Sequence, residues 1–268
     1  MMFAAIDLHI DIKTAPMFHI GEFAVTNAML TGTVSLIVFI AIFGYVAKML
    51  KTGKYNRFVG LVQWAFEGML SQIDSVIPNK KIARSIAPLA LTIFFYVLIS
   101  YWMSVLPGLD SIKYDGNPVL RSIAADMNFT FALAFISLIA TQFYAIRAHG
   151  GIGNLKRYFR NPFKDFIGAF EGILELIGEI SRYSALSLRL FGNCFAGEVL
   201  LLIMSVLTGY FAVMTLPVFM AFELFIGFIQ AYVFFVLTII FTSLATESHG
   251  PHPEHSAVKS SKKMVAAE

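Results

Sequence analysis

Apolar positions along the chain gather into long stretches that charged segments separate. The first runs from Ala28 to Ala47 without a charged residue. It has the length of about 20 residues that one membrane-spanning helix requires. Two similar stretches, about Ser85–Leu106 and Asn128–Ala148, predict a second and a third span, and Pro107-Gly108 ends the second.

Residues 58–77 follow a different pattern. Apolar side chains recur at helical spacing between Val59 and Ile73, but polar side chains are interspersed around the same helix. The polar side chains are Gln63, Glu67, Gln72 and Asp74. Polar groups at this frequency make a spanning helix costly, so we expect an amphipathic helix at the membrane surface. A helix packed on the soluble side is an open alternative.

The last third of the chain predicts two more helices, about 163–207 and Val218–Ala245, separated by an uncharged turn that Thr208-Gly209 and Pro217 bracket. A helix of forty-odd residues rises 1.5 Å per residue, about twice the thickness of a bilayer. The first of the two must therefore be tilted, kinked or curved. Together the patterns predict an all-α polytopic membrane protein with about five membrane helices and one surface helix.

The amino-acid composition excludes several classes of protein and of binding site. The 268 residues are 57% hydrophobic and 14% charged, which excludes an ordinary soluble domain. The net charge of +3 does not indicate nucleic-acid binding, because the basic residues concentrate in a few loops. One cysteine, Cys194, allows no intrachain disulfide and no cysteine metal site. We expect no cofactor and no metal, and the absence of a glycine-rich phosphate loop places nucleotide chemistry outside this chain.

Basic residues also predict the orientation. Five spans place segments 48–84, 147–165 and 246–268 on one side, and these hold fifteen of the twenty Lys and Arg residues. An excess of this size marks the cytoplasmic side. We therefore expect an outer N-terminal segment over 1–27, a membrane domain over 28–248, and a disordered cytoplasmic tail over 249–268.

Two charged residues interrupt the apolar stretch from Arg182 to Leu202. Arg189 keeps its charge at any accessible pH, and at membrane depth a guanidinium costs about 2.5–3.5 kcal/mol on insertion scales. Glu198 follows nine residues later, on roughly the opposite side of the helix. Such residues often mark ion pathways. A buried structural cation with a glutamate reaching the interface is the open alternative.

Other polar residues repeat on the faces of the last two helices. Glu223 and Gln230 are seven residues apart, and Glu175, Arg182 and Arg189 form a second stripe at the same spacing. The arrangement indicates two polar paths that meet at an arginine, with carboxylates that can carry protons. Glu171, Glu175 and Glu179 also recur at steps of four, and for this segment we favour a solvated amphipathic face with Glu179 paired to Arg182.

Three segments resemble one known family. SLRLFGNCFAGEVLL (187–201) is similar to the signature of subunit a of the rotary F-type ATP synthase. FELFIGFIQAYVFFVLTIIFTSLA (222–245) resembles the family's final helix, and DMNFT (126–130) resembles its D-x-N-x-T motif. The resemblance covers about residues 20–248. It implies that the last two helices are long and strongly tilted in the membrane.

The resemblance also implies roles for individual residues. Arg189 would be the stator arginine that faces a carboxylate of the rotating c-ring, with Asn193 and Gln230 in support. Glu198 and Glu223 would line the outer half-channel, where relatives often have one histidine. The remaining implied residues, on the cytoplasmic half-channel, are Glu175 and the nearby Arg182. Tyr183-Ser184-Ala185 replaces a step that often contains proline in the family.

The implied function is that of the proton-translocating Fo stator subunit, in a bacterial inner membrane. Its implied partners are the c-ring, peripheral-stalk subunit b, other ATP synthase subunits and membrane lipid, without nucleic acid. Three alternatives stay open: a sodium-translocating version, a self-contained channel or secondary transporter, and a structural anchor. The lack of an internal repeat disfavours the transporter.

Overall fold

The computed structural model describes residues 16–20, 22–106, 113–114, 117–118, 121–150 and 166–246. Its long helices are α1 (Asn27–Lys51), α2 (Arg57–Val76), α3 (Lys80–Ser104), α4 (Met127–His149), α6 (Phe166–Thr208) and α7 (Ala212–Thr246). Two short 3-10 helices are η2 (Ile123–Ala125) and η3 (Gly209–Phe211). Two small antiparallel pairs, β1 (Pro16–Ile20) with β2 (Phe23–Thr26) and β3 (Lys113–Tyr114) with β4 (Asn117–Pro118), were not predicted.

Helices of membrane-span length dominate the described chain. Four of its stretches are long and apolar enough to cross a membrane, and the fourth, Phe170–Thr246, contains both α6 and α7. The prediction of an all-α polytopic membrane protein with about five membrane helices is therefore confirmed. Residues 1–15 and 21 of the predicted outer segment 1–27, and all of the predicted tail 249–268, lie outside the described residues.

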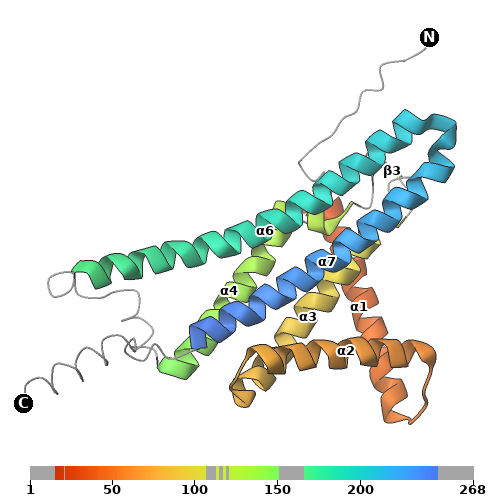
Figure 1. Cartoon of the computed structure of the whole chain (residues 1–268). Coiled ribbons are helices and arrows are strands. Elements are labelled where there is room, and N and C mark those ends of the chain that lie inside the picture. Colours follow the sequence, from red (N-terminus) through yellow and green to blue (C-terminus); the bar gives the residue numbers. More distant parts are fainter. Residues whose placement is uncertain are drawn as a thin grey trace, which may run out of the picture.

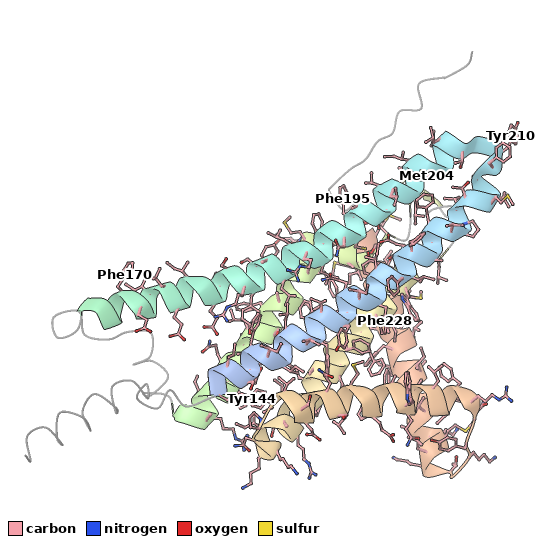
Figure 2. The ribbon with its side chains drawn as sticks, viewed as in Figure 1. Tyr144, Phe170, Phe195, Met204, Tyr210 and Phe228 are labelled. Carbon is pink, nitrogen blue, oxygen red and sulfur yellow. The ribbon has the colours of Figure 1, made fainter. Side chains whose placement is uncertain are left out.

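The last two helices form a long antiparallel hairpin. In Figure 1, α6 and α7 lie side by side and cross α1, α3 and α4 obliquely. In Figure 2, Phe170 marks the beginning of α6, and Tyr210, fully exposed, lies at the tip of the hairpin. The 43 residues of α6 make a helix about 64 Å long. Because this is about twice the apolar thickness of a bilayer, α6 fits a membrane only when strongly tilted.

The turn between α6 and α7 is shorter than the sequence predicts. We expected Pro217 to precede the last helix, but α7 begins at Ala212 and contains this proline. Gly209 has φ +50°, a left-handed conformation that costs glycine little and reverses the chain within η3. Pro217 lies near the start of the helix, where one missing backbone donor is tolerated more easily than at its centre.

Side-chain caps set the first residue of several helices. Thr26, Asn56 and Asn79 accept hydrogen bonds from backbone N–H groups in the first turns of α1, α2 and α3. Asp126 does the same for α4, where its Oδ1 lies 2.9 Å from the N–H of Asn128. The aspartate of the DMNFT segment is thus a helix cap, which satisfies a backbone donor that has no partner within the helix.

The surface helix lies across one end of the bundle. In Figure 1, α2 lies crosswise at the lower ends of α1 and α3. It buries Val59, Val62 and Ile73 against its neighbours and leaves Trp64 exposed by 77%. The seven Lys and Arg residues of segment 48–84 are all exposed and gather at this end. The predicted amphipathic helix is therefore confirmed, and its location at a membrane surface stays a prediction.

Buried hydroxyl groups join α4 to the long helices. Ser137 and Thr141 of α4 lie 2.9 and 3.2 Å from Thr238 and Thr242 of α7. Tyr183 of α6 donates a hydrogen bond of 2.8 Å to Thr141. Such small hydroxyl residues let helix backbones approach closely and satisfy each other's polar atoms. They fix the first half of α6 and the second half of α7 on α4.

Candidate functional site

Arg189 lies on an open face of α6. Its side chain is exposed, as are Ala185, Asn193 and Ala196 on neighbouring turns, whereas Leu186 and Leu190 of the same helix are buried. In the part of the chain that the structure describes, Arg189 makes no hydrogen bond or ion pair. A guanidinium at membrane depth needs a partner. This face of α6 therefore presents a cation between small side chains to something outside the chain.

Asn193 and Gln230 lie beside this arginine and connect the two long helices. The Asn193 side chain donates a hydrogen bond of 3.0 Å to Gln230 Oε1. Gln230 is 2% exposed, and its Nε2 has no partner among the described residues. The structure joins Asn193 to Gln230, the two residues that the sequence grouped with Arg189, and it leaves Asn193 on the same open face of α6 as Arg189.

Glu223 lies in a closed site between α3, α6 and α7. The carboxyl group is 4% exposed, and the Tyr101 hydroxyl donates a hydrogen bond of 2.5 Å to its Oε1. A Cβ added at Gly197 of α6 would overlap the Glu223 carboxyl group. The missing side chain of Gly197 therefore makes the space that Glu223 occupies.

Glu198 is held by the segment that precedes α4. The guanidinium of Arg121 lies 3.8 Å from Glu198 Oε2, and the backbone N–H of Ser122 donates a hydrogen bond of 3.2 Å to Oε1. The side chain of Glu198 is 28% exposed. Ser122 also contacts the buried thiol of Cys194, 2.9 Å away. Cys194 is thus both a packing residue, as expected, and a neighbour of the polar group around Glu198.

The inner part of α6 differs from the pairing considered from the sequence. Glu179 is 9% exposed and accepts a hydrogen bond of 2.7 Å from Gln142 of α4. Arg182 is exposed, donates to the Gly178 carbonyl, and lies over the ring of Phe241 at 5.0 Å. The predicted pair of Glu179 with Arg182 is therefore wrong, because each side chain has a different partner. Glu175 is half-buried one turn earlier.

Two separate polar groups result. Glu198 and Glu223 cluster in the half of the hairpin nearer the turn between α6 and α7, while Glu175, Glu179 and Arg182 lie nearer the beginning of α6. Arg189 lies between them along the helix, nine residues from Glu198, which corresponds to about 13 Å. Sequence reasoning missed Tyr101, Arg121 and Ser122 as partners of the outer carboxyl groups. No periodic pattern connects these residues to the helices that they contact.

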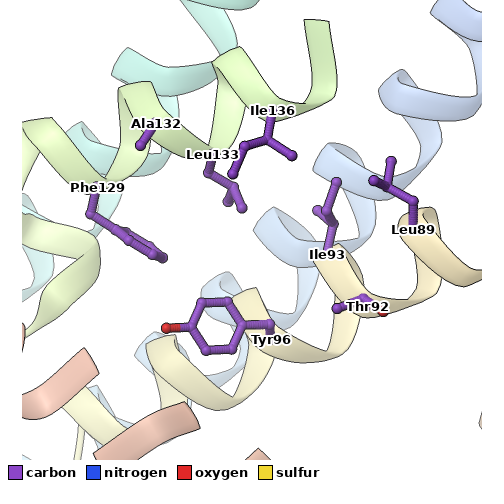
Figure 3. A pocket seen from close by; sticks show the side chains of 8 residues that line it. All are labelled: Leu89, Thr92, Ile93, Tyr96, Phe129, Ala132, Leu133 and Ile136. Atoms are coloured by element: carbon purple, nitrogen blue, oxygen red, sulfur yellow. The ribbon is translucent and has the colours of Figure 1, made fainter. Parts of the chain in front are cut away.

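A cavity of about 310 Å³ lies between α3 and α4 (Figure 3). Its lining is almost entirely apolar and includes Leu89, Ile93, Phe129 and Ile136. Ile136 is half exposed, so the cavity faces the surroundings of the bundle. An apolar lining does not stabilise an ion, and this cavity is not a candidate for the polar path. In the described residues, no three His, Cys, Asp or Glu side chains gather as metal ligands would.

Comparison with known proteins shows the family of this chain. The sequence model of the family described as ATP synthase A chain matches residues 28–243. The chain belongs to this family. It is 38% identical to ATP synthase subunit a of Mycobacterium leprae (strain TN) over 186 residues, 69% of this chain and 71% of that protein.

Two further relatives extend the similarity over most of the chain. Subunit a of Mycobacterium bovis is 34% identical over 235 residues, which cover 85% of this chain and 89% of the relative. Subunit a of Buchnera aphidicola is 33% identical over 221 residues, 79% of each chain. As a member of the ATP synthase A chain family with several membrane helices, the chain is an integral membrane protein of the Fo part of ATP synthase.

Proposed function

We propose that this chain is the proton-translocating stator subunit of Fo, and that Arg189 faces the ion-carrying carboxylate of a rotating c-ring. The observation that supports this proposal is the open face of α6, where Arg189 has no partner among the described residues. The small side chains beside it, Ala185 and Ala196, leave room for a helix to slide past. A passing carboxylate would supply the missing charge partner.

The two polar groups are the proposed half-channels. Glu198 and Glu223 receive protons from the outer side, and Glu175 with Arg182 borders the inner path. The arginine between them cannot carry a proton, which prevents a direct leak. The hydrogen bond between Asn193 and Gln230 keeps two polar side chains one helical turn from Arg189. A proton must therefore cross from one path to the other on the ring.

The remaining assignments follow from the same proposal. The basic end of the bundle, where α2 lies, faces the cytoplasm of a bacterial cell, and segment 1–27 lies outside. Residues 28–248 form the membrane domain and 249–268 the cytoplasmic tail. The partners are the c-ring, subunit b and the other ATP synthase subunits. Protons are the proposed ion, and a sodium-translocating version is the alternative.

The test is ATP-driven pumping by the whole ATP synthase in inverted membrane vesicles. Arg189→Ala is expected to abolish pumping while the assembled amount of the complex persists. Arg84→Ala is the comparison, because this exposed arginine of α3 is assigned to neither half-channel, and it should pump as the wild type does. ATP-driven uptake of sodium without acidification in the wild type would replace the proton by sodium. Full proton pumping by Arg189→Ala would refute the role of this arginine.

Contact with the ring is tested separately. Single cysteines along Leu186–Ala196, in a Cys194→Ala background, are paired with a cysteine near the carboxylate of subunit c. Disulfide crosslinks on the face of Arg189 and Asn193 are expected. Crosslinks at the buried positions Leu186 or Leu190 instead would contradict the proposed interface, and so would the absence of a crosslink at every position.

A further inference from the structure

We propose that Tyr101 is a positioning residue of the outer proton path, which fixes the carboxyl group of Glu223 through its hydroxyl. This inference rests on the proposed function, because it assigns Glu223 to that path. It adds a residue of α3 to a site that sequence reasoning built from the last two helices alone.

Tyr101 is the single hydrogen-bond partner that Glu223 has within the described residues. Both side chains are almost completely buried, with exposed fractions of 0% for Tyr101 and 4% for Glu223. A buried carboxyl group without a partner is costly. The Tyr101 hydroxyl meets this requirement and, at 2.5 Å from Oε1, fixes where one carboxyl oxygen lies.

Two glycines make the space for this pair. A Cβ at Gly227 of α7 would overlap the Tyr101 ring, and a Cβ at Gly197 of α6 would overlap the carboxyl group. Tyr101 can therefore lie flat against α7, and Glu223 can lie flat against α6. The phenol ring and the carboxyl group fill two adjacent spaces that the helix backbones leave open. This fit favours one orientation of Glu223 over the others that its rotatable bonds allow.

The surrounding charged groups come from the neighbouring elements. Tyr101 interacts electrostatically with Cys194 and Glu198 of α6 as well as with Glu223. Glu198 in turn has the cation of Arg121 beside it. Glu198 therefore has a cation and a backbone donor, whereas Glu223 has a neutral hydroxyl. The carboxyl groups of Glu198 and Glu223 therefore have different hydrogen-bond and charge partners, and Tyr101 is the partner of Glu223.

The experiment compares Tyr101→Phe with Tyr144→Phe in the whole ATP synthase. Phenylalanine keeps the ring against Gly227 and removes only the hydroxyl. Tyr144 is the matched control, since its hydroxyl also joins two helices, by a 2.7 Å hydrogen bond to the Ser85 carbonyl, but lies far from the outer carboxyl groups. Passive proton conduction through Fo is measured against external pH in vesicles stripped of the ATP-hydrolysing part, alongside Glu223→Gln.

Tyr101→Phe is expected to lower conduction about tenfold and to move the pH of half-maximal rate by about 0.5–1 unit, the size that one hydrogen bond can supply. Tyr144→Phe is expected to conduct as the wild type does. Adding Tyr101→Phe to Glu223→Gln should bring no further loss, because the hydroxyl acts through the carboxyl group. Gly227→Ala, which displaces the ring and keeps the hydroxyl, should also lower conduction.

Other results overturn the inference in distinguishable ways. If Tyr101→Phe conducts normally with an unchanged pH profile while Glu223→Gln is impaired, the inference fails and the proposed path remains. Equal losses in Tyr101→Phe and Tyr144→Phe, without a pH shift, would make the hydroxyl a structural contact. Wild-type conduction by Glu223→Gln would remove Glu223 itself from the path, and the proposed outer half-channel with it.

Discussion

Replacement of Gly197 by alanine tests the arrangement of the outer site most directly. The change adds one methyl group to α6, at a position where a Cβ would overlap the Glu223 carboxyl group. The neighbour is a buried carboxyl group held by a hydrogen bond, so it cannot swing into solvent. We expect the methyl group to displace Glu223 from Tyr101.

Two opposing contributions set the magnitude. Alanine is favoured over glycine inside a helix by about 0.8–1 kcal/mol. Overpacking of a closed site costs about 1–3 kcal/mol, and loss of a hydrogen bond to a charged group costs about 1.5–3 kcal/mol. The unfavourable contributions exceed the gain. Since each 1.36 kcal/mol added to a barrier slows a step tenfold, loss of the hydrogen bond alone should lower proton conduction by about 10- to 100-fold.

The assay is ATP-driven acidification of inverted vesicles, normalised to the assembled complex. Gly178→Ala is the control on the same helix, because nothing lies within 4 Å of a Cβ there. It should pump as the wild type does. Adding Glu223→Asp to Gly197→Ala shortens the displaced side chain by one methylene group and should restore part of the activity. Normal pumping by Gly197→Ala alone would show that the Glu223 carboxyl group is not held against α6.

Three further results are expected. Glu198→Gln and Glu223→Gln should each slow proton conduction, since each loses an ionisable group, and wild-type rates in the double variant would exclude both from the path. The buried Cys194 thiol should resist maleimide labelling in the assembled complex and react after denaturation; rapid labelling of the native complex would contradict its burial. Thr141→Val should lower the free energy of unfolding by about 1–2 kcal/mol, because it removes the hydroxyl that accepts a hydrogen bond from Tyr183. Thermal unfolding in detergent measures this change, and an unchanged melting temperature would show that the contact does not form.

Some properties of this protein could be predicted from its sequence because they depend on residues close together in the chain. The uncharged stretch after Asn27 has the length of a membrane span. The apolar residues of 57–76 recur at helical spacing and form one face of an amphipathic helix. Arg189 and Asn193 share a face because they are one helical turn apart, and the structure places both on the open side of α6. The thickness of a bilayer, the helical period and the cost of burying a charge were sufficient for these predictions.

The turn before α7 shows where local signals mislead. Pro217 marks a helix boundary in most contexts, yet here it lies inside α7, because Gly209 reverses the chain earlier. Likewise Glu179 and Arg182 have the spacing of an ion pair within one helix, but Gln142 and Phe241 approach from other helices and take their place. Each local preference is small and yields to contacts made elsewhere.

The sequence by itself determined the number of long helices, the surface helix and the unusual arginine on α6. The tertiary structure alone decided what surrounds the outer carboxyl groups: Tyr101 of α3 for Glu223, and Arg121 with Ser122 for Glu198. The physical reason is that these partners are separated by more than seventy residues, and no helical period relates positions on different helices. Their contacts exist because α3, η2, α6 and α7 pack together, with glycines at the points of closest approach.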